Sequence, residues 1–219
     1  MKSYPVYLVA LMLSLFAPSS QATTILDDSS QGIYNSGIGT LLDTSGTTDP
    51  FPCANSACGD LTVFFPTEPN LSAASSALGA WLTNSTAPGG TWSASVEAIP
   101  FGWAANTETA IIYAINAGTG IANLSLLLGV DNGIFVWLDG DYLFGARGPG
   151  ASVLGEYSVA LPNLTGTHYL QLLREDHGSG QGFDIQLSGN AVRAAAVPEP
   201  GTIALLTLGM VALALRRRT

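Results

Sequence analysis

Residues 124–138, with the sequence LSLLLGVDNGIFVWL, decide the fold class. Leucine occupies every second position from 124 to 128, and branched aliphatic residues occupy every second position from 134 to 138. Asn132-Gly133 stands between the two runs, and Asn-Gly is a common tight-turn dipeptide. Because successive side chains of a strand point to opposite faces, the stretch predicts two antiparallel strands that each present one apolar face.

The same signals continue on both sides of that stretch. Residues 110–115 are apolar on both faces, as expected for a central strand, and apolar residues alternate again in 157–161, 169–173 and 183–187. Together these runs make at least six strands within about 90 residues, and no helical pattern separates them. We therefore predict an all-β fold, a jelly-roll-like antiparallel β-sandwich, rather than an α/β fold.

The chain before residue 100 carries weaker patterns. Residues 23–60 are rich in Ser, Thr, Gly and Asp and predict loops with one or two edge strands, whereas residues 61–65 predict a buried strand. Asn70 is a favourable N-cap, and apolar residues follow it at helical spacing. We expect one short amphipathic helix here, held by the packing of Leu78 and Trp81.

Composition and charge exclude several classes of protein. Of 219 residues only 11% are charged, while Gly and Pro number 25 and 12, which argues against coiled coils. Between residues 23 and 196 fifteen acids face three arginines, for a net charge near −12. Such a body repels nucleic acid and other polyanions, so no nucleic-acid partner is expected. Neutral polysaccharide and calcium-bridged contacts both remain open.

The N-terminal residues 1–22 have the three parts of a secretory signal peptide. Lys2 supplies the positive charge, Val6 to Ala17 is apolar, and Ser20-Gln21-Ala22 places small residues at a cleavage site. An apolar run of about 12 residues is short for a membrane span, which disfavours the alternative of a retained anchor. We expect a signal helix that signal peptidase removes on export.

The C-terminal residues 197–219 also contain three parts in a fixed order. They are Val197, Pro198, Glu199 and Pro200, then the apolar run Ile203 to Leu215, then Arg216, Arg217 and Arg218. The prolines keep the preceding chain extended, and the terminal arginines favour a cytoplasmic end. We expect a short transmembrane helix, with a simple C-terminal anchor as the alternative to a processed tail.

Those three parts resemble the PEP-CTERM sorting tail of exported bacterial proteins. The resemblance implies recognition by an exosortase, a membrane-embedded sorting enzyme, and removal of the tail near Pro-Glu-Pro. It further implies a precursor tethered to the inner membrane of a Gram-negative bacterium. The product would reach the cell surface or the extracellular matrix of cells that make exopolysaccharide and biofilm. The predicted organisation is a signal peptide (1–22), an exported domain (23–196, hereafter the body) and a sorting tail (197–219).

Cys53 and Cys58 are the only cysteines, five positions apart. In an exported protein such a pair predicts a disulfide that closes a small loop. A zinc site would need two further ligands, and a redox motif would need Cys-x-x-Cys spacing. We therefore expect a structural disulfide.

Two groups of polar residues are candidate sites. The first group consists of candidate calcium ligands at turns: Asp131, Asp139 and Asp141. Aspartate is also common at turns without any metal. A strand of roughly 17–20 Å separates Asp131 from the other two carboxylates. No cofactor other than calcium is indicated.

The second group precedes a glycine-rich turn and consists of Arg174, Glu175, Asp176 and His177. These side chains can bind sugar hydroxyls or act as acid and base. Cross-strand ion pairing of the arginine is the structural alternative.

Among the four tryptophans, Trp92 and Trp103 are the candidates for surface platforms that stack on sugars, whereas Trp137 fits the core. Short motifs in the body also resemble galactose-binding-like jelly-roll domains. These motifs are Gly102-Trp103, Gly129-Val130-Asp131, Trp137-Leu138-Asp139-Gly140 and Gly166-Thr167-His168-Tyr169-Leu170. The resemblance implies a non-catalytic sandwich whose loops bind glycans.

These features lead to one main functional hypothesis and two alternatives. The main one is an exported, exosortase-sorted protein of the envelope or biofilm matrix, non-catalytic, with exopolysaccharide as a candidate ligand. The alternatives are a small secreted hydrolase that uses Glu175, Asp176 and His177, and a calcium-stabilised adhesin.

Overall fold

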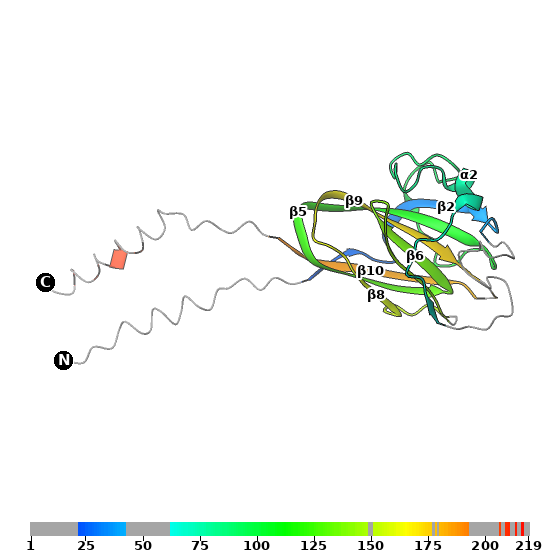
Figure 1. Cartoon of the computed structure of the whole chain (residues 1–219). Helices are drawn as coiled ribbons and strands as arrows, with labels where there is room; N and C mark the ends of the chain where they lie inside the picture. The colour runs from blue at the N-terminus through cyan, green and yellow to red at the C-terminus, as the bar shows by residue number, and fades with distance from the viewer. Residues whose placement is uncertain are drawn as a thin grey trace.

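The computed structural model describes residues 22–42, 62–148, 151–176, 178 and 180–192, with five single positions in the C-terminal segment. Within these residues the chain is almost entirely antiparallel β-structure (Figure 1). The strands are β1 (Thr23–Leu26), β2 (Gln31–Gly39), β3 (Val63–Phe64), β4 (Glu97–Ala98), β5 (Glu108–Asp131), β6 (Gly133–Leu138), β7 (Asp141–Arg147), β8 (Tyr157–Ala160), β9 (Leu164–Glu175) and β10 (Gly182–Ala191). A 3-10 turn, η2 (Ser72–Ala74), leads into the short helix α2 (Ser75–Leu78).

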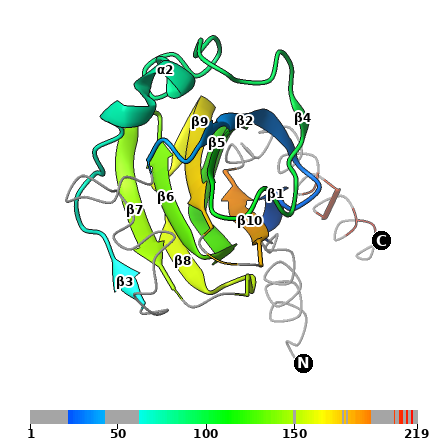
Figure 2. The ribbon, with the colours of Figure 1, turned by 90° about the vertical axis from the view of Figure 1, so that its right-hand side faces the viewer.

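Strand β5 organises the sandwich because it belongs to both of its layers. Its first half pairs with β2 and β9, and its second half pairs with β10 and β8. The larger layer runs β2-β5-β9-β6-β7-β3, and the smaller one runs β1-β10-β5-β8. Seen end-on in Figure 2, the sheet curls so that β10 and β1 lie across from β9 and β6. The predicted all-β antiparallel sandwich is confirmed.

The chain bends between the layers at residues 116–123. Gly118 and Asn123 adopt positive φ angles of 52° and 53°, and the register with β9 shifts twice before Ile121. Glycine and asparagine tolerate this conformation better than other residues. The sequence pattern predicted two separate strands at 110–115 and 124–128; the structure instead continues pairing through the bend, so the two runs form one strand of 24 residues.

The inner core lies between the two layers and is mainly aliphatic. Leu126 and Leu128 of β5, Val136 of β6, and Leu172 of β9 have no exposed surface. Each alternates along its strand with residues that face outward, as the period of two requires. The alternation recognised in the sequence therefore marks this core correctly.

The outer face of the larger layer is buried as well, under a cover made by residues 65–92. Figure 2 places α2 outside β6, β7 and β9, and a second apolar cluster fills the space between. Its largest members are Trp81 from the cover and Phe135 and Trp137 from β6. The strands β5, β6 and β9 are thus buried on both faces, which explains why residues 110–115 lack polar alternation.

Two local predictions need correction. The predicted buried strand at 61–65 is only the two-residue edge strand β3, and Phe64 is 62% exposed. The helix predicted from Asn70 is shorter than its apolar spacing suggests, because Gly79 at φ 58° ends it and approaches the carbonyl of Pro88 too closely for a Cβ. The N-cap of η2 is Leu71 rather than the predicted Asn70, whose Oδ1 accepts a hydrogen bond from the Ser72 N–H at 3.0 Å in the turn just before it. The edge strands expected in 23–60 correspond to β1 and β2.

The two terminal predictions and the disulfide fall largely outside the described residues. These exclude 1–21, Cys53, Cys58, and all of the sorting signal except Arg216. Among the helices that the structure does describe, none is long and apolar enough to cross a membrane.

Candidate ligand-binding pocket on the outer face

The cover attaches to the sheet through side chains that bond to backbone groups. The Asn35 side-chain amide donates to the carbonyl of Ala77 at 2.8 Å, and the Trp92 indole N–H donates to the carbonyl of Leu78 at 2.9 Å. A short helix leaves several carbonyls without helical partners, and these two bonds use such groups. The Asn35 bond ties α2 to strand β2, and the Trp92 bond holds α2 within the cover.

Three tryptophans form the centre of the outer cluster. Trp81 stacks on Trp92 with ring centroids 5.7 Å apart and meets Trp137 edge-on at 5.2 Å. Aromatic pairs at these separations and angles attract each other beyond the effect of buried area. The cluster therefore holds the cover and strand β6 in a fixed relation.

Glu68 is joined to this cluster by a hydrogen bond. The indole N–H of Trp137, a residue with no exposed surface, donates to Glu68 Oε1 at 2.8 Å. A buried indole N–H needs an acceptor, and Glu68 supplies it from the exposed entrance of the cover. The carboxylate is thus placed at a defined position beside the aromatic rings.

A pocket of about 300 Å³ opens at this point, between α2 and the segment before it. Its lining combines the carboxylate of Glu68, the hydroxyls of Ser72 and Ser75, and an apolar floor. The floor and rim residues are Pro69, Leu71, Leu78, Gly79, Trp81 and Leu82. A few polar groups around an apolar floor are the usual composition of a small-molecule site.

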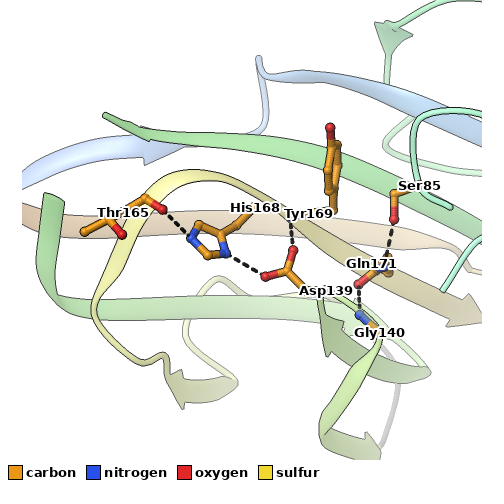
Figure 3. Close-up of polar contacts among 7 residues, drawn as sticks. All are labelled: Ser85, Asp139, Gly140, Thr165, His168, Tyr169 and Gln171. Carbon is orange, nitrogen blue, oxygen red and sulfur yellow. Dashed lines mark hydrogen bonds and ion pairs between the residues drawn. The ribbon is translucent and has the colours of Figure 1, made fainter. Parts of the chain in front are cut away.

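A buried hydrogen-bond chain joins the cover, at Ser85, to strand β9 and the β6–β7 turn (Figure 3). Gln171 of β9 has no exposed surface; its amide donates to Ser85 Oγ at 3.0 Å, and its Oε1 accepts from the Gly140 N–H at 3.2 Å. One side chain thereby ties together the cover, strand β9 and the β6–β7 turn. The Ser85 hydroxyl also donates to the carbonyl of Trp81 at 3.0 Å, which connects this chain to the pocket lining.

The neighbouring pair of His168 and Asp139 closes the same turn. His168 Nδ1 lies 2.6 Å from Asp139 Oδ2, and its Nε2 lies 2.9 Å from the carbonyl oxygen of Thr165 (Figure 3). Both partners accept hydrogen bonds, so both ring nitrogens have a donor role only in the imidazolium form. The hydrogen bond that His168 donates to Asp139 raises the pKa of His168 above its usual value.

The structure gives Trp92 and Trp103 packing roles. Both are half-buried: Trp92 stacks on Trp81, while the Trp103 ring lies 4.2 Å from the Arg174 guanidinium carbon, and its indole N–H donates to the carbonyl of Thr107. Their proposed role in ligand binding stays a prediction.

Arg174 lies in a box of aromatic rings inside the sandwich. Besides Trp103, the rings of Phe183 and Tyr34 lie 4.7 and 5.6 Å from its guanidinium carbon, and its Nε and Nη1 donate to Thr109 and to the carbonyl of Pro100. Cation–π attraction and these bonds replace the cross-strand ion pair considered above. Complete burial lowers the pKa of Arg174 to about 10, so it remains a cation.

Glu175 and Asp176, the other described members of the Arg174 group, are buried. Glu175 and Asp176 are 0% and 1% exposed, and Asp176 Oδ2 accepts a hydrogen bond from the Asn106 N–H at 2.7 Å. His177 lies outside the described residues. The two carboxylates therefore lack the access to substrate that acid–base chemistry requires in this conformation.

The calcium candidates do not converge. Asp131 ends β5 and precedes β6, whereas Asp139 and Asp141 lie at the opposite end of β6. Asp139 instead bonds His168 and the Tyr169 N–H. In the part of the chain that the structure describes, no three potential metal-ligating side chains form a group.

Sequence reasoning missed Glu68, Ser72 and Ser75 as site residues and assigned Trp81 only to helix packing. A lone Glu-Pro before a short helix carries no distinctive motif. The hydrogen bond between the Trp137 indole and the Glu68 carboxylate is visible only in the folded structure.

Comparison with known proteins bears on one end of the chain. Residues 196–218 match the PEP-CTERM protein-sorting motif, and no curated protein matches the chain. The motif supports an exported protein whose membrane-anchored precursor an exosortase processes. It gives no information on the ligand of the body.

Proposed function

We propose that the body is a non-catalytic, carbohydrate-binding sandwich of the cell envelope or biofilm matrix, and that the outer-face pocket is its ligand site. The observation that carries this proposal is the carboxylate of Glu68, anchored by the buried Trp137 beside serine hydroxyls and an apolar floor. A carboxylate accepts hydrogen bonds from sugar hydroxyls, and the C–H face of a sugar packs on an apolar floor.

The charge of the body favours neutral saccharides. A net charge near −12 repels acidic polysaccharides over the range of a Debye length, about 8 Å at physiological salt. The pocket itself adds a further carboxylate. A pocket of about 300 Å³ fits one or two sugar units at the lower end of ligand-site volumes. Neutral exopolysaccharide, bound at a chain end or branch, is therefore the proposed ligand.

The two alternatives receive less support. The hydrolase hypothesis needs accessible carboxylates, and Glu175 and Asp176 are buried. The adhesin hypothesis needs converging oxygen ligands, and Asp131 and Asp139 lie at opposite ends of β6. Neither has an observation of its own that favours it.

The proposal is tested by titrating the purified body with neutral oligosaccharides of glucose, galactose and mannose in an isothermal calorimeter. Glu68→Gln keeps an oxygen acceptor for Trp137 but removes the charge, and we expect it to weaken binding about tenfold, the loss of one charge-assisted hydrogen bond. Glu97→Gln on the exposed strand β4 is the matched control and leaves affinity unchanged. No binding by any neutral oligosaccharide, or equal affinity of the two variants, contradicts the proposal.

A further inference from the structure

Among the described residues that line the outer-face pocket, Glu68 alone is charged, and only half of its carboxylate is used within the protein. Its Oε1 accepts the hydrogen bond from the Trp137 indole at 2.8 Å. In the part of the chain that the structure describes, no other group donates to this exposed carboxylate, so Oε2 keeps its lone pairs for a ligand. Because the indole bond already restricts the side chain, binding costs less conformational entropy than at a mobile glutamate.

Two serine hydroxyls of the pocket are also free to bind a ligand. Ser72 belongs to η2 and Ser75 begins α2 three positions later, so both lie on one side of this turn. Both side chains are exposed, and within the described residues neither hydroxyl bonds to another protein group. A hydroxyl both donates and accepts hydrogen bonds, so this pair can bind the hydroxyls of a sugar whose other substituent contacts Glu68.

The described surface of the body exposes no arginine or lysine that could neutralise Glu68. The body has three arginines and no lysine. Arg147 and Arg174 are 4% and 0% exposed, and Arg193 lies outside the described residues. Glu68 is also the only charged residue of the cover, residues 65–92. The pocket therefore keeps the full attraction of its carboxylate for a cation.

Two further carboxylates lie at the β6–β7 turn beside the pocket rim. Gly140 of this turn lies against the carbonyl of Leu82, a rim residue, too closely for a Cβ. The exposed Asp139 and Asp141 flank Gly140. His168 pairs with Asp139 (Figure 3), whereas no described cation pairs with Asp141. The potential at this rim is consequently negative, and the low-dielectric wall of a pocket strengthens such a potential.

We propose that the outer-face pocket selects a sugar unit with a free amino group, within a polymer whose other units are neutral. The inference rests on the proposed function and names the unit that the pocket takes. The ammonium group of such a unit has three N–H donors and can bond to Glu68 Oε2. It adds the attraction of opposite charges to the hydrogen bond, whereas a sugar hydroxyl in the same place supplies the bond alone.

A metal ion fits this pocket less well than an amino sugar. Calcium requires six to eight oxygen ligands, and the lining offers one carboxylate and two hydroxyls. In the described part of the chain, no three potential metal-ligating side chains form a group. The apolar floor gives a metal ion no further ligand, but it can pack against the C–H face of a sugar ring.

The test compares three tetrasaccharides by isothermal calorimetry, built from glucosamine, from N-acetylglucosamine and from glucose. The full chain is purified in a detergent whose head group is not a sugar, and the titration is run at pH 6, where a sugar amine carries its proton. We expect the glucosamine oligomer to bind about fivefold more tightly than the other two, since exposed ion pairs contribute at most about this much. In 1 M salt the preference should fall below twofold.

Two variants separate contact with Glu68 from the general charge of the body. Glu68→Gln keeps an acceptor for Trp137 and should bind the three oligomers with equal affinity. Asp141→Asn removes a neighbouring charge outside the pocket lining and should keep most of the preference. Urea unfolding checks that both variants remain folded. An equal loss of preference in both variants would overturn the proposal, because the selection would then come from the overall field.

The remaining outcomes distinguish this inference from the proposed function. Equal binding of the glucosamine and glucose oligomers by the native chain overturns the amino-sugar inference and leaves carbohydrate binding in place. Binding of no oligomer contradicts both. Methylamine is the control for the charge alone: if it displaces the glucosamine oligomer at equal concentration, the pocket recognises an amine rather than a sugar, and the inference fails.

Discussion

The inner and outer faces of the larger layer are both buried, but different kinds of structure bury them. Regular strands of the smaller layer cover the aliphatic inner face, whereas the irregular segment 65–92 covers the aromatic outer face. The strands that cover the inner face are held in place by backbone hydrogen bonds between neighbouring strands. The outer face depends on a few side-chain hydrogen bonds, such as those of Asn35 and Gln171. The comparison teaches that the proposed ligand pocket lies in the part of the fold held mainly by side-chain contacts rather than by strand pairing.

The largest effect is expected from Trp81→Ala on the outer face. The change leaves a cavity beside Trp92 and Trp137, and we expect the free energy of unfolding to fall by about 3–5 kcal/mol. Hydrogen exchange should show loss of protection in residues 74–92 before any loss in β5. Simultaneous loss of protection in both would contradict the view that the cover opens separately.

A slightly smaller loss is expected from Leu172→Ala on the inner face. Leu172 has no exposed surface, and its truncation should cost about 2–5 kcal/mol in urea unfolding. Here hydrogen exchange should accelerate in both layers together, because the inner core joins them. If only the cover loses protection, the two faces are coupled differently from the way we describe.

The smallest effect concerns His168, which ties strand β9 to the β6–β7 turn. Its pKa is raised in the folded state, so its stabilising contribution is complete below the unfolded value of about 6.5 and is lost as pH rises through the folded value. His168→Asn should therefore lower the free energy of unfolding by about 0.5–1 kcal/mol at pH 5.5 and by less at pH 8.5. The effect is small because the His168–Asp139 pair is partly exposed to solvent.

Asp139→Asn provides the control for this pH dependence. Without the carboxylate, the difference between pH 5.5 and pH 8.5 should shrink, as measured by urea unfolding at both values. An equal destabilisation by His168→Asn at the two pH values would show that the imidazolium form contributes nothing.

Prediction from sequence succeeded where one strand carries its own pattern. Alternation in 134–138 and 183–187 identified β6 and β10, and the uniformly apolar residues 110–115 identified a strand buried on both faces. The prediction of two separate strands failed at residues 116–123. Glycine and asparagine occur both in a bend within a continuous strand and in a turn that ends a strand, so composition does not distinguish the two. It also failed at Phe64, since an apolar strand residue at a sheet edge looks like one in the centre.

The candidate site was less predictable than the fold. Arg174 was predicted to bind a ligand or to form a cross-strand ion pair, whereas the aromatic rings around it come from three separate stretches of chain. The pocket residue Glu68 was not recognised, because its partner Trp137 lies 69 positions away. Motifs report neighbours in the chain, whereas these contacts join distant segments.

The sequence alone determined the all-β class, the acidic body and the sorting tail, because alternation, charge and the Pro-Glu-Pro signature are properties of consecutive residues. Only the tertiary structure decided that β5 serves both layers, that Glu68 meets Trp137, and that β1 and β10 pair side by side. The physical reason is that burial and pairing depend on which strands become neighbours. That choice depends on the packing of the whole chain rather than on any one segment.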